Sequence, residues 1–125
     1  MVFDTDVLIW FLRGNQRAAK TIQDAPEKSI SIISYMELVQ GARDKKELKA
    51  IKSFLTDNGI NILLLTENIG HRASIYMHEY CLSGGLTVLD SMIAATVVEA
   101  GETLCTANIK HFRIIKDLDI VVFKP

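Results

Sequence analysis

The sequence predicts an α/β fold, a three-layer sandwich in which helices cover both faces of a mostly parallel sheet. Short apolar segments rich in β-branched residues alternate with longer segments of helical periodicity, which is the pattern of repeated β–α–β units. The segment 60–65 is hydrophobic at nearly every position, as central strands buried on both faces are. Because no repeat, low-complexity segment or linker interrupts this pattern, we predict a single domain over residues 1–125.

The first half of the chain contains three predicted strands and four predicted helices. The apolar residues 1–3 form a strand that turns at once into a helix ending at Gly14. Asn15 is a typical N-cap for a second helix, which Pro26 stops. The alternating, β-branched residues 28–33 predict the next strand. The remaining elements of this half are helices at 35–42, with Ser34 before the first residue, and at 47–58, and the strand at 60–65.

The second half begins with two longer helices. Thr66 is a suitable start for the first, which Gly84-Gly85 closes, and Thr87 for the second, which ends at Gly101. Strands are then expected at 103–106 and 120–123, with a single helical turn at 108–112 between them.

Composition narrows the class of protein. Hydrophobic residues make up 49% and charged residues 23%, which is ordinary for a globular domain. The net charge of −1 produces no global positive field for nucleic acid, although a local basic rim is compatible with it. Cys81 and Cys105 form no CxxC pair, so we expect reduced thiols. No basic leader and no apolar run of about 20 residues occurs, so we expect a soluble, cytoplasmic protein without a membrane segment.

Asp4 and Asp6 follow the first strand, and each has two interpretations. Either acid is a suitable N-cap for the next helix, with Thr5 assisting. A cap accounts for only one of them, and Asp4 lies between apolar Phe3 and an apolar run that starts at Val7, where an unsatisfied carboxylate is unfavourable. Ligands of open α/β sheets bind at the carboxyl ends of strands. We therefore expect a functional role for Asp4 and a capping or supporting role for Asp6.

Glu37 and Asp90 also have two interpretations. Ser34-x-x-Glu37 and Thr87-x-x-Asp90 both fit capping boxes, in which the acid reaches back to the first residue of the motif. Glu37 lies opposite the apolar stripe of its helix, so only its position after a strand favours a function. Asp90 shares its helix face with apolar residues at i+3, i+4 and i+7, and an inward-facing carboxylate there calls for a cation.

A metal ion resolves the problem of three acids at one sheet edge. Like charges brought together repel each other and destabilise the fold, and a divalent cation reverses the sign of that interaction. Carboxylates are hard ligands that suit Mg²⁺ or Mn²⁺. Such an ion lowers the pKa of a bound water and neutralises charge that builds on a phosphodiester. We predict that Asp4, Glu37 and Asp90 hold Mg²⁺ or Mn²⁺.

Taken together, these motifs resemble those of the PIN-domain ribonucleases, and more closely those of VapC-type toxins of bacterial toxin–antitoxin pairs. The resemblance covers essentially the whole chain. Its motifs are Asp4-Thr5-Asp6, Ser34-x-x-Glu37-Leu38 with Gly41, Asp90 with Ile93-Ala94-Ala95, and Thr106-x-Asn108-x-x-His111-Phe112. The resemblance implies hydrolysis of single-stranded RNA by a water that Mg²⁺ or Mn²⁺ activates in a pocket of Asp4, Glu37 and Asp90.

The resemblance also implies roles for the neighbouring residues. Asn108 stands where the family often has a fourth acid, so it offers an oxygen but no charge, and this departure argues against a tightly bound second metal. Thr5 and Thr106 are expected to brace the site through their hydroxyls. Family members form homodimers and bind an antitoxin across helices near the site. The candidate contacts for that antitoxin here are Trp10-Phe11-Leu12, for which core packing is the favoured alternative.

Several other polar residues have weaker interpretations. Arg13 and Lys110 are candidates for RNA phosphate contacts because they follow Asp4 and Asn108 closely. His71 and His78 share a helix face at i, i+7, where polar surface is a better explanation than a zinc site. His111 is expected to hydrogen-bond a loop.

Two other functions compete with the nuclease. One is a non-catalytic PIN-like binding module whose acids only cap helices. The other is an aspartate-dependent phosphatase, since Asp4-x-Asp6 after a strand matches the pattern of an aspartyl nucleophile. The phosphatase is less favoured because the later strand ends show no suitably placed lysine.

Overall fold

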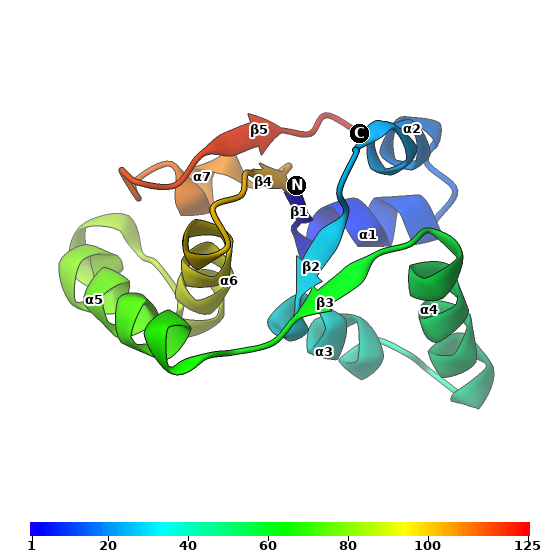
Figure 1. The fold of residues 1–125 in the computed structure, drawn as a ribbon, viewed down its shortest axis with the longest axis horizontal. Helices are drawn as coiled ribbons and strands as arrows, with labels where there is room; N and C mark the ends of the chain where they lie inside the picture. Colours follow the sequence, from blue (N-terminus) through cyan, green and yellow to red (C-terminus); the bar gives the residue numbers. More distant parts are fainter.

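Five short strands form the sheet in a computed structural model that describes all residues 1–125 (Figure 1). The strands are β1 (Val2–Phe3), β2 (Ser29–Ser31), β3 (Asn61–Leu63), β4 (Leu104–Thr106) and β5 (Ile120–Val122). Their order is β3-β2-β1-β4-β5, and every neighbouring pair is parallel. The predicted fold class is confirmed, with a sheet that is entirely parallel.

Seven helices connect and cover the strands. They are α1 (Thr5–Leu12), α2 (Gln16–Asp24), α3 (Ile32–Gln40), α4 (Lys45–Asp57), α5 (Glu67–Gly84), α6 (Val88–Glu99) and α7 (Ile109–Phe112). In Figure 1, α5, α6 and α7 gather on one side of the strands, and α1, α2 and α4 on the other. No helix has the length and apolar character of a membrane-spanning segment.

The sheet separates two hydrophobic cores, because successive side chains of a strand point to opposite faces. Val2 and Leu104 belong to the core that α5 and α6 cover, whereas their neighbours Phe3 and Cys105 belong to the core that α1, α2 and α4 cover. All four side chains are fully buried. The same alternation in the two central strands therefore produces the middle layer of the sandwich.

The segment 60–65 is a correction to the expected central strand. The structure pairs only Asn61–Leu63, and β3 lies at the edge of the sheet. Ile62 and Leu63 pack at the margins of the two cores, but Leu64 is 66% exposed and Leu65 is 40% exposed. The run is apolar beyond the strand because it continues into an exposed connection to α5.

The start of α3 is a second correction. A strand to residue 33 and a helix from Tyr35 capped by Ser34 were expected, but β2 ends at Ser31 and the helix begins at Ile32. Ser31 is the N-cap, since its side-chain oxygen accepts the backbone N–H of Ile33 at 3.1 Å. Ser34 lies inside the helix, where its buried hydroxyl has no hydrogen-bond partner. The predicted Ser34–Glu37 capping box is therefore absent.

Other boundaries lie close to the predicted ones. α4 begins earlier than expected, at Lys45, because the Asp44 side chain accepts the backbone N–H of Glu47. Thr66 caps α5, and Gly85 ends it with a left-handed φ of 64°. That conformation favours glycine, and it explains why the Gly84-Gly85 pair closes the helix.

Candidate active site

The carboxyl edge of the sheet gathers the acids that the sequence singled out. Asp4 follows β1 directly, Glu37 lies in the second turn of the helix after β2, and Asn108 follows β4 by two residues. Parallel strands end at the same edge, so their following residues meet there. Asp90 reaches this edge from the first turn of α6.

Asp4 is almost entirely buried, with 7% of its surface exposed. Its Oδ1 accepts the backbone N–H of Thr5, and its Oδ2 accepts the hydroxyl of Thr106, both at 2.8 Å. The pKa of Asp4 is raised to about 7, mainly by burial and then by the negative charge of Asp6, while the two hydrogen bonds oppose the rise. Asp4 is also the N-cap of α1, one of the two roles expected of Asp6. Capping and burial therefore coincide in one side chain.

Asp6 connects α1 to the turn after β4. Its Oδ2 accepts the backbone N–H of Ala107 at 3.0 Å and lies 3.5 Å from the hydroxyl oxygen of Thr106. Its Oδ1 is buried and has no hydrogen-bond partner. Burial raises the pKa of Asp6, and the bond to Ala107 partly offsets the rise. Asp6 therefore supports the site rather than capping the helix.

Glu37 is held by a residue from another helix. Its Oε1 accepts the hydroxyl of Thr5 at 2.7 Å. Because the N–H of Thr5 donates to Asp4, this one residue binds two carboxylates. Glu37 thus turns toward α1 instead of reaching back along its own helix.

Asp90 forms half of its predicted capping box. The side-chain oxygen of Thr87 accepts the backbone N–H of Asp90 at 3.2 Å, whereas the carboxylate of Asp90 lies 3.3 Å from Nδ1 of His111. His111 was expected to bond a loop, so this contact is a correction. Asp90 is also one of the charges that raise the pKa of Asp4. No local sequence signal joins Asp90 to His111, because they lie on different helices.

Asn108 contributes its backbone to the site. Its N–H donates to the hydroxyl oxygen of Thr106 at 2.9 Å, while its side chain makes no capping bond to α7. The hydroxyl of Thr106 therefore accepts from Asn108 and donates to Asp4 at the same time. Asn108 is exposed.

The chemistry of these groups fits a hard divalent cation. No lysine or arginine forms an ion pair with Asp4, Asp6, Glu37 or Asp90, so the carboxylates outnumber the positive charges around them. Unpaired buried carboxylates are unfavourable unless a cation compensates them. As they stand, no three His, Cys, Asp or Glu side chains lie close enough to hold an ion together. The carboxylates are connected through Thr5 and Thr106, but they do not converge on a single point.

A groove of about 550 Å³ adjoins the site between α1, α3 and α4. Ile9, Leu12 and Leu38 line it, and Glu37 and Arg13 also form part of its wall. Leu12 is 43% exposed there. The other two candidates for partner contacts, Trp10-Phe11, are partly buried against the core, so packing explains them better. Lys110 is exposed on α7.

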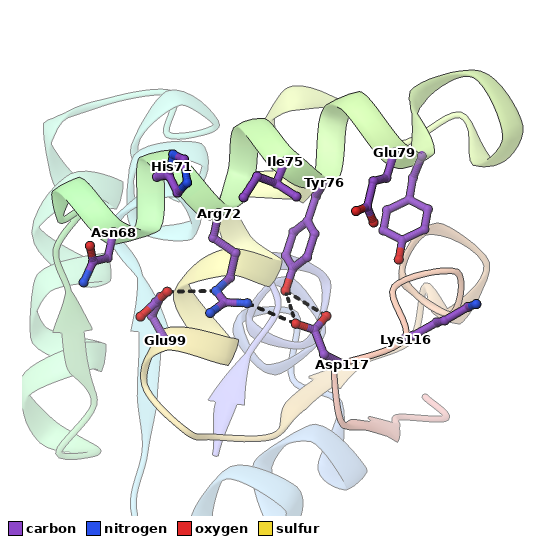
Figure 2. Close-up of a pocket in the computed structure, with 10 residues that line it drawn as sticks. Asn68, His71, Arg72, Ile75, Tyr76, Glu79, Glu99, Lys116 and Asp117 are labelled. Atoms are coloured by element: carbon purple, nitrogen blue, oxygen red, sulfur yellow. Dashed lines mark hydrogen bonds and ion pairs between the residues drawn. The ribbon is translucent and has the colours of Figure 1, made fainter.

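A second cavity, of about 300 Å³, lies between α5, α6 and the segment after α7 (Figure 2). Arg72 donates to Glu99 at 2.8 Å and to Asp117 at 3.0 Å, and the Tyr76 hydroxyl lies 2.9 Å from both oxygens of Asp117. His71 also lines it. The charges of Arg72, Glu99 and Asp117 pair with one another and none belongs to the carboxyl edge, so we interpret this network as structural.

Comparison with known proteins gives consistent matches. Residues 1–117 match the family model described as the PIN domain. The chain is 30% identical over 122 residues to the protein named ribonuclease VapC19 of Mycobacterium tuberculosis, covering 94% of this chain and 95% of that one.

Solved structures agree. A toxin–antitoxin complex from Klebsiella pneumoniae matches with a TM-score of 0.81 at 28% identity, covering 97% of this chain and 95% of that one. VapBC-1 from nontypeable Haemophilus influenzae matches with a TM-score of 0.79 at 25% identity, covering 98% of each chain. DNA-bound VapBC from Salmonella typhimurium shares the fold, with a TM-score of 0.83 at 20% identity over 97% of this chain and 96% of that one.

Proposed function

The chain belongs to the PIN domain family, and from that premise we propose that it is a VapC-type endoribonuclease that hydrolyses phosphodiester bonds of single-stranded RNA. The observation that carries this proposal is the buried carboxylate of Asp4, which is held by two hydrogen bonds beside other acids and has no basic partner. The arrangement suits a site that acts on a phosphodiester with the help of a cation.

Asp4, Glu37 and Asp90 are the residues that would hold Mg²⁺ or Mn²⁺. When bound, the ion supplies positive charge that lowers the pKa of a water molecule and offsets charge building on the phosphate. The second oxygen of Glu37 is available for this role, because only Oε1 accepts a hydrogen bond from the protein. His111 orients Asp90 from the side of α7.

The hydroxyls of Thr5 and Thr106 fix the direction of these carboxylates. Thr106 donates to Asp4, and Thr5 donates to Glu37, so each acid presents its remaining lone pairs in a defined direction. Partners of this kind orient metal-binding groups and limit their motion. Asn108 lies at the same turn as Thr106 and is exposed, so its neutral amide is available to orient a water molecule or the RNA. Arg13 and Lys110 are the cations we assign to RNA phosphates.

A protein partner is also part of the proposal. The matched structures from Klebsiella and Haemophilus are a toxin–antitoxin complex and VapBC-1. We infer that this chain binds a cognate antitoxin, and that an apolar segment of it occupies the groove lined by Ile9, Leu12 and Leu38. Because Glu37 belongs to the same groove, an occupant there would block access to the site.

We further propose a cytoplasmic homodimer, for which the exposed apolar side chains around the α5–α6 connection are suitable contacts. Leu82 is 99% exposed, Val88 58% and Leu89 45%. Apolar residues that gather on a surface in this way are typical of protein–protein contacts.

The test of the catalytic proposal uses single-stranded RNA and matched variants. The unmodified protein should cleave RNA with Mn²⁺ and not with EDTA, and Asp4→Asn and Asp90→Asn should each abolish cleavage while remaining folded. Asp57→Asn, which neutralises an exposed acid on α4, is the control and should cleave normally. Undiminished cleavage by Asp4→Asn would contradict the proposal. Hydrolysis of a phosphomonoester without RNA cleavage would favour the phosphatase, and activity on neither substrate would favour the binding module.

A further inference from the structure

We propose that Asp6 is a positioning residue of the cation site, which fixes the turn after β4 and adds a fourth negative charge beside Asp4. This inference rests on the proposed function and deepens it. It concerns a residue two positions after Asp4 in the first turn of α1, for which the sequence left a helix cap and a supporting role open.

The first observation is the set of contacts that Asp6 makes. Its carboxylate reaches from α1 to the far side of the site and accepts the N–H of Ala107 at 3.0 Å. Ala107 lies between Thr106, whose hydroxyl orients Asp4, and Asn108, whose N–H donates to that same hydroxyl. The bond from Asp6 therefore holds the middle of the turn on which the orientation of Asp4 depends.

The second observation is the oxygen that Asp6 leaves unpaired. Oδ1 is buried and has no hydrogen-bond partner, and no lysine or arginine pairs with the carboxylate. The bond to Ala107 needs only an acceptor, which a neutral asparagine would also supply. A charged group at this position is unfavourable for the fold on its own. A cation beside Asp4 gives that charge a stabilising role.

The third observation is the position of its charge. The hydroxyl oxygen of Thr106 lies 2.8 Å from Oδ2 of Asp4 and 3.5 Å from Oδ2 of Asp6. The two carboxylates therefore lie close together, and a divalent cation beside Asp4 would be attracted by both.

A simpler role predicts a different outcome. Asp6 lies in the first turn of α1, where any acid interacts favourably with the helix dipole. If that were its only role, Asp6→Asn would lower the melting temperature slightly and leave Mn²⁺ affinity unchanged.

The test measures Mn²⁺ affinity directly, by the electron paramagnetic resonance signal of the free ion, in parallel with melting curves. Asp6→Asn keeps an acceptor for Ala107 but removes the charge, and its affinity should fall about tenfold or more. Asn108→Asp adds a charge on the same turn, so the double variant Asp6→Asn with Asn108→Asp should regain most of the affinity. Asp24→Asn, which neutralises an exposed acid on α2, is the control.

Unchanged Mn²⁺ affinity in Asp6→Asn would overturn the inference. If Asp6→Asn does not fold, Asp6→Ser provides a smaller neutral side chain for the same titration, and unchanged affinity there would overturn it equally. Asp4→Asn separates the inference from the proposed function. If Asp4→Asn and Asp90→Asn both bind Mn²⁺ as the unmodified protein does, the metal site itself is wrong. If they lose binding while Asp6→Asn keeps it, only the role of Asp6 is wrong.

Discussion

The hydroxyl of Thr5 donates a hydrogen bond of 2.7 Å to Glu37, joining the first turn of α1 to α3. The backbone N–H of the same threonine donates to Asp4. One residue therefore binds two of the carboxylates proposed to hold the metal, one through its backbone N–H and the other through its hydroxyl.

Replacing Thr5 should reduce activity more than stability. In Thr5→Ala, the carboxylate of Glu37 loses its only hydrogen bond from the protein, and we expect cleavage to slow by about 10- to 100-fold. The free energy of unfolding should fall by only about 1 kcal/mol, because the bond is partly buried. Thr5→Ser keeps the hydroxyl and should retain most activity. Equal losses in the two variants would contradict the role of the hydroxyl.

Replacing Thr106 should lower the stability of the fold. Thr106→Val keeps the shape of this fully buried residue but leaves an oxygen of Asp4 and the N–H of Asn108 without a partner. We expect the free energy of unfolding to fall by about 2–3 kcal/mol. Thr96→Val is the matched control, since the hydroxyl of Thr96 bonds only the carbonyl of Met92 within its own helix. Urea denaturation of both variants tests the difference.

The pKa of Asp4 predicts an unusual dependence of stability on pH in the metal-free protein. The pKa rises from 3.8 to about 7 on folding, so folding favours the protonated acid. Its contribution to stability is therefore fullest below 3.8 and is lost as the pH rises through about 7. Asp4→Asn does not titrate, and it should exceed the unmodified protein by roughly 2–4 kcal/mol at pH 8 but not at pH 4, in EDTA. Equal pH profiles would contradict this assignment.

The two cysteines should differ in reactivity. Cys81 is exposed, whereas Cys105 is buried in β4 and its pKa is raised to about 11, mainly by burial and then by Asp6. At pH 8 a disulfide reagent should therefore modify one thiol rapidly and the second only after unfolding. Cys81→Ser should abolish the rapid phase. A rapid phase that persists in this variant would show that β4 is accessible.

The network in Figure 2 should stabilise the fold without affecting catalysis. Tyr76→Phe removes the hydroxyl that contacts both oxygens of Asp117. We expect the free energy of unfolding to fall by about 1 kcal/mol, while RNA cleavage and Mn²⁺ affinity stay unchanged. Tyr80→Phe, on the same helix and without a hydrogen bond from its hydroxyl to Asp117, is the control. A loss of cleavage in Tyr76→Phe would mean that a change in this cavity affects the active site at the carboxyl edge of the sheet.

Much of the fold is visible in the sequence because burial and periodicity are local properties. The order of elements and the buried position of Asp4 follow from which residues are apolar and how they are spaced. The N-cap of α3 was harder to predict from the sequence, because Ser31 and Ser34 are equally good cap residues. The choice of Ser31 depends on the strand ending where it pairs with Leu63. Propensity alone contains no information about that pairing.

The hydrogen bonds that complete the site could not be predicted from local sequence patterns. Asp6 and Ala107 are 101 residues apart, and Thr5 and Glu37 are 32 apart. Which strands become neighbours determines these contacts, and the strand order β3-β2-β1-β4-β5 differs from the order in the chain. The acidic residues of the site could therefore be identified from the sequence, but the hydroxyl and amide groups that hydrogen-bond to them could not.

The central strand β1 precedes the other four strands in the chain, whereas its neighbour β4 is the fourth of the five. The bond between Asp4 and Thr106 spans 102 residues, so a growing polypeptide lacks it until Thr106 has been synthesised. Truncated products that stop before β4 cannot orient Asp4, and their first strand keeps one edge open. The carboxyl edge of the sheet is therefore assembled only after β4 has been synthesised.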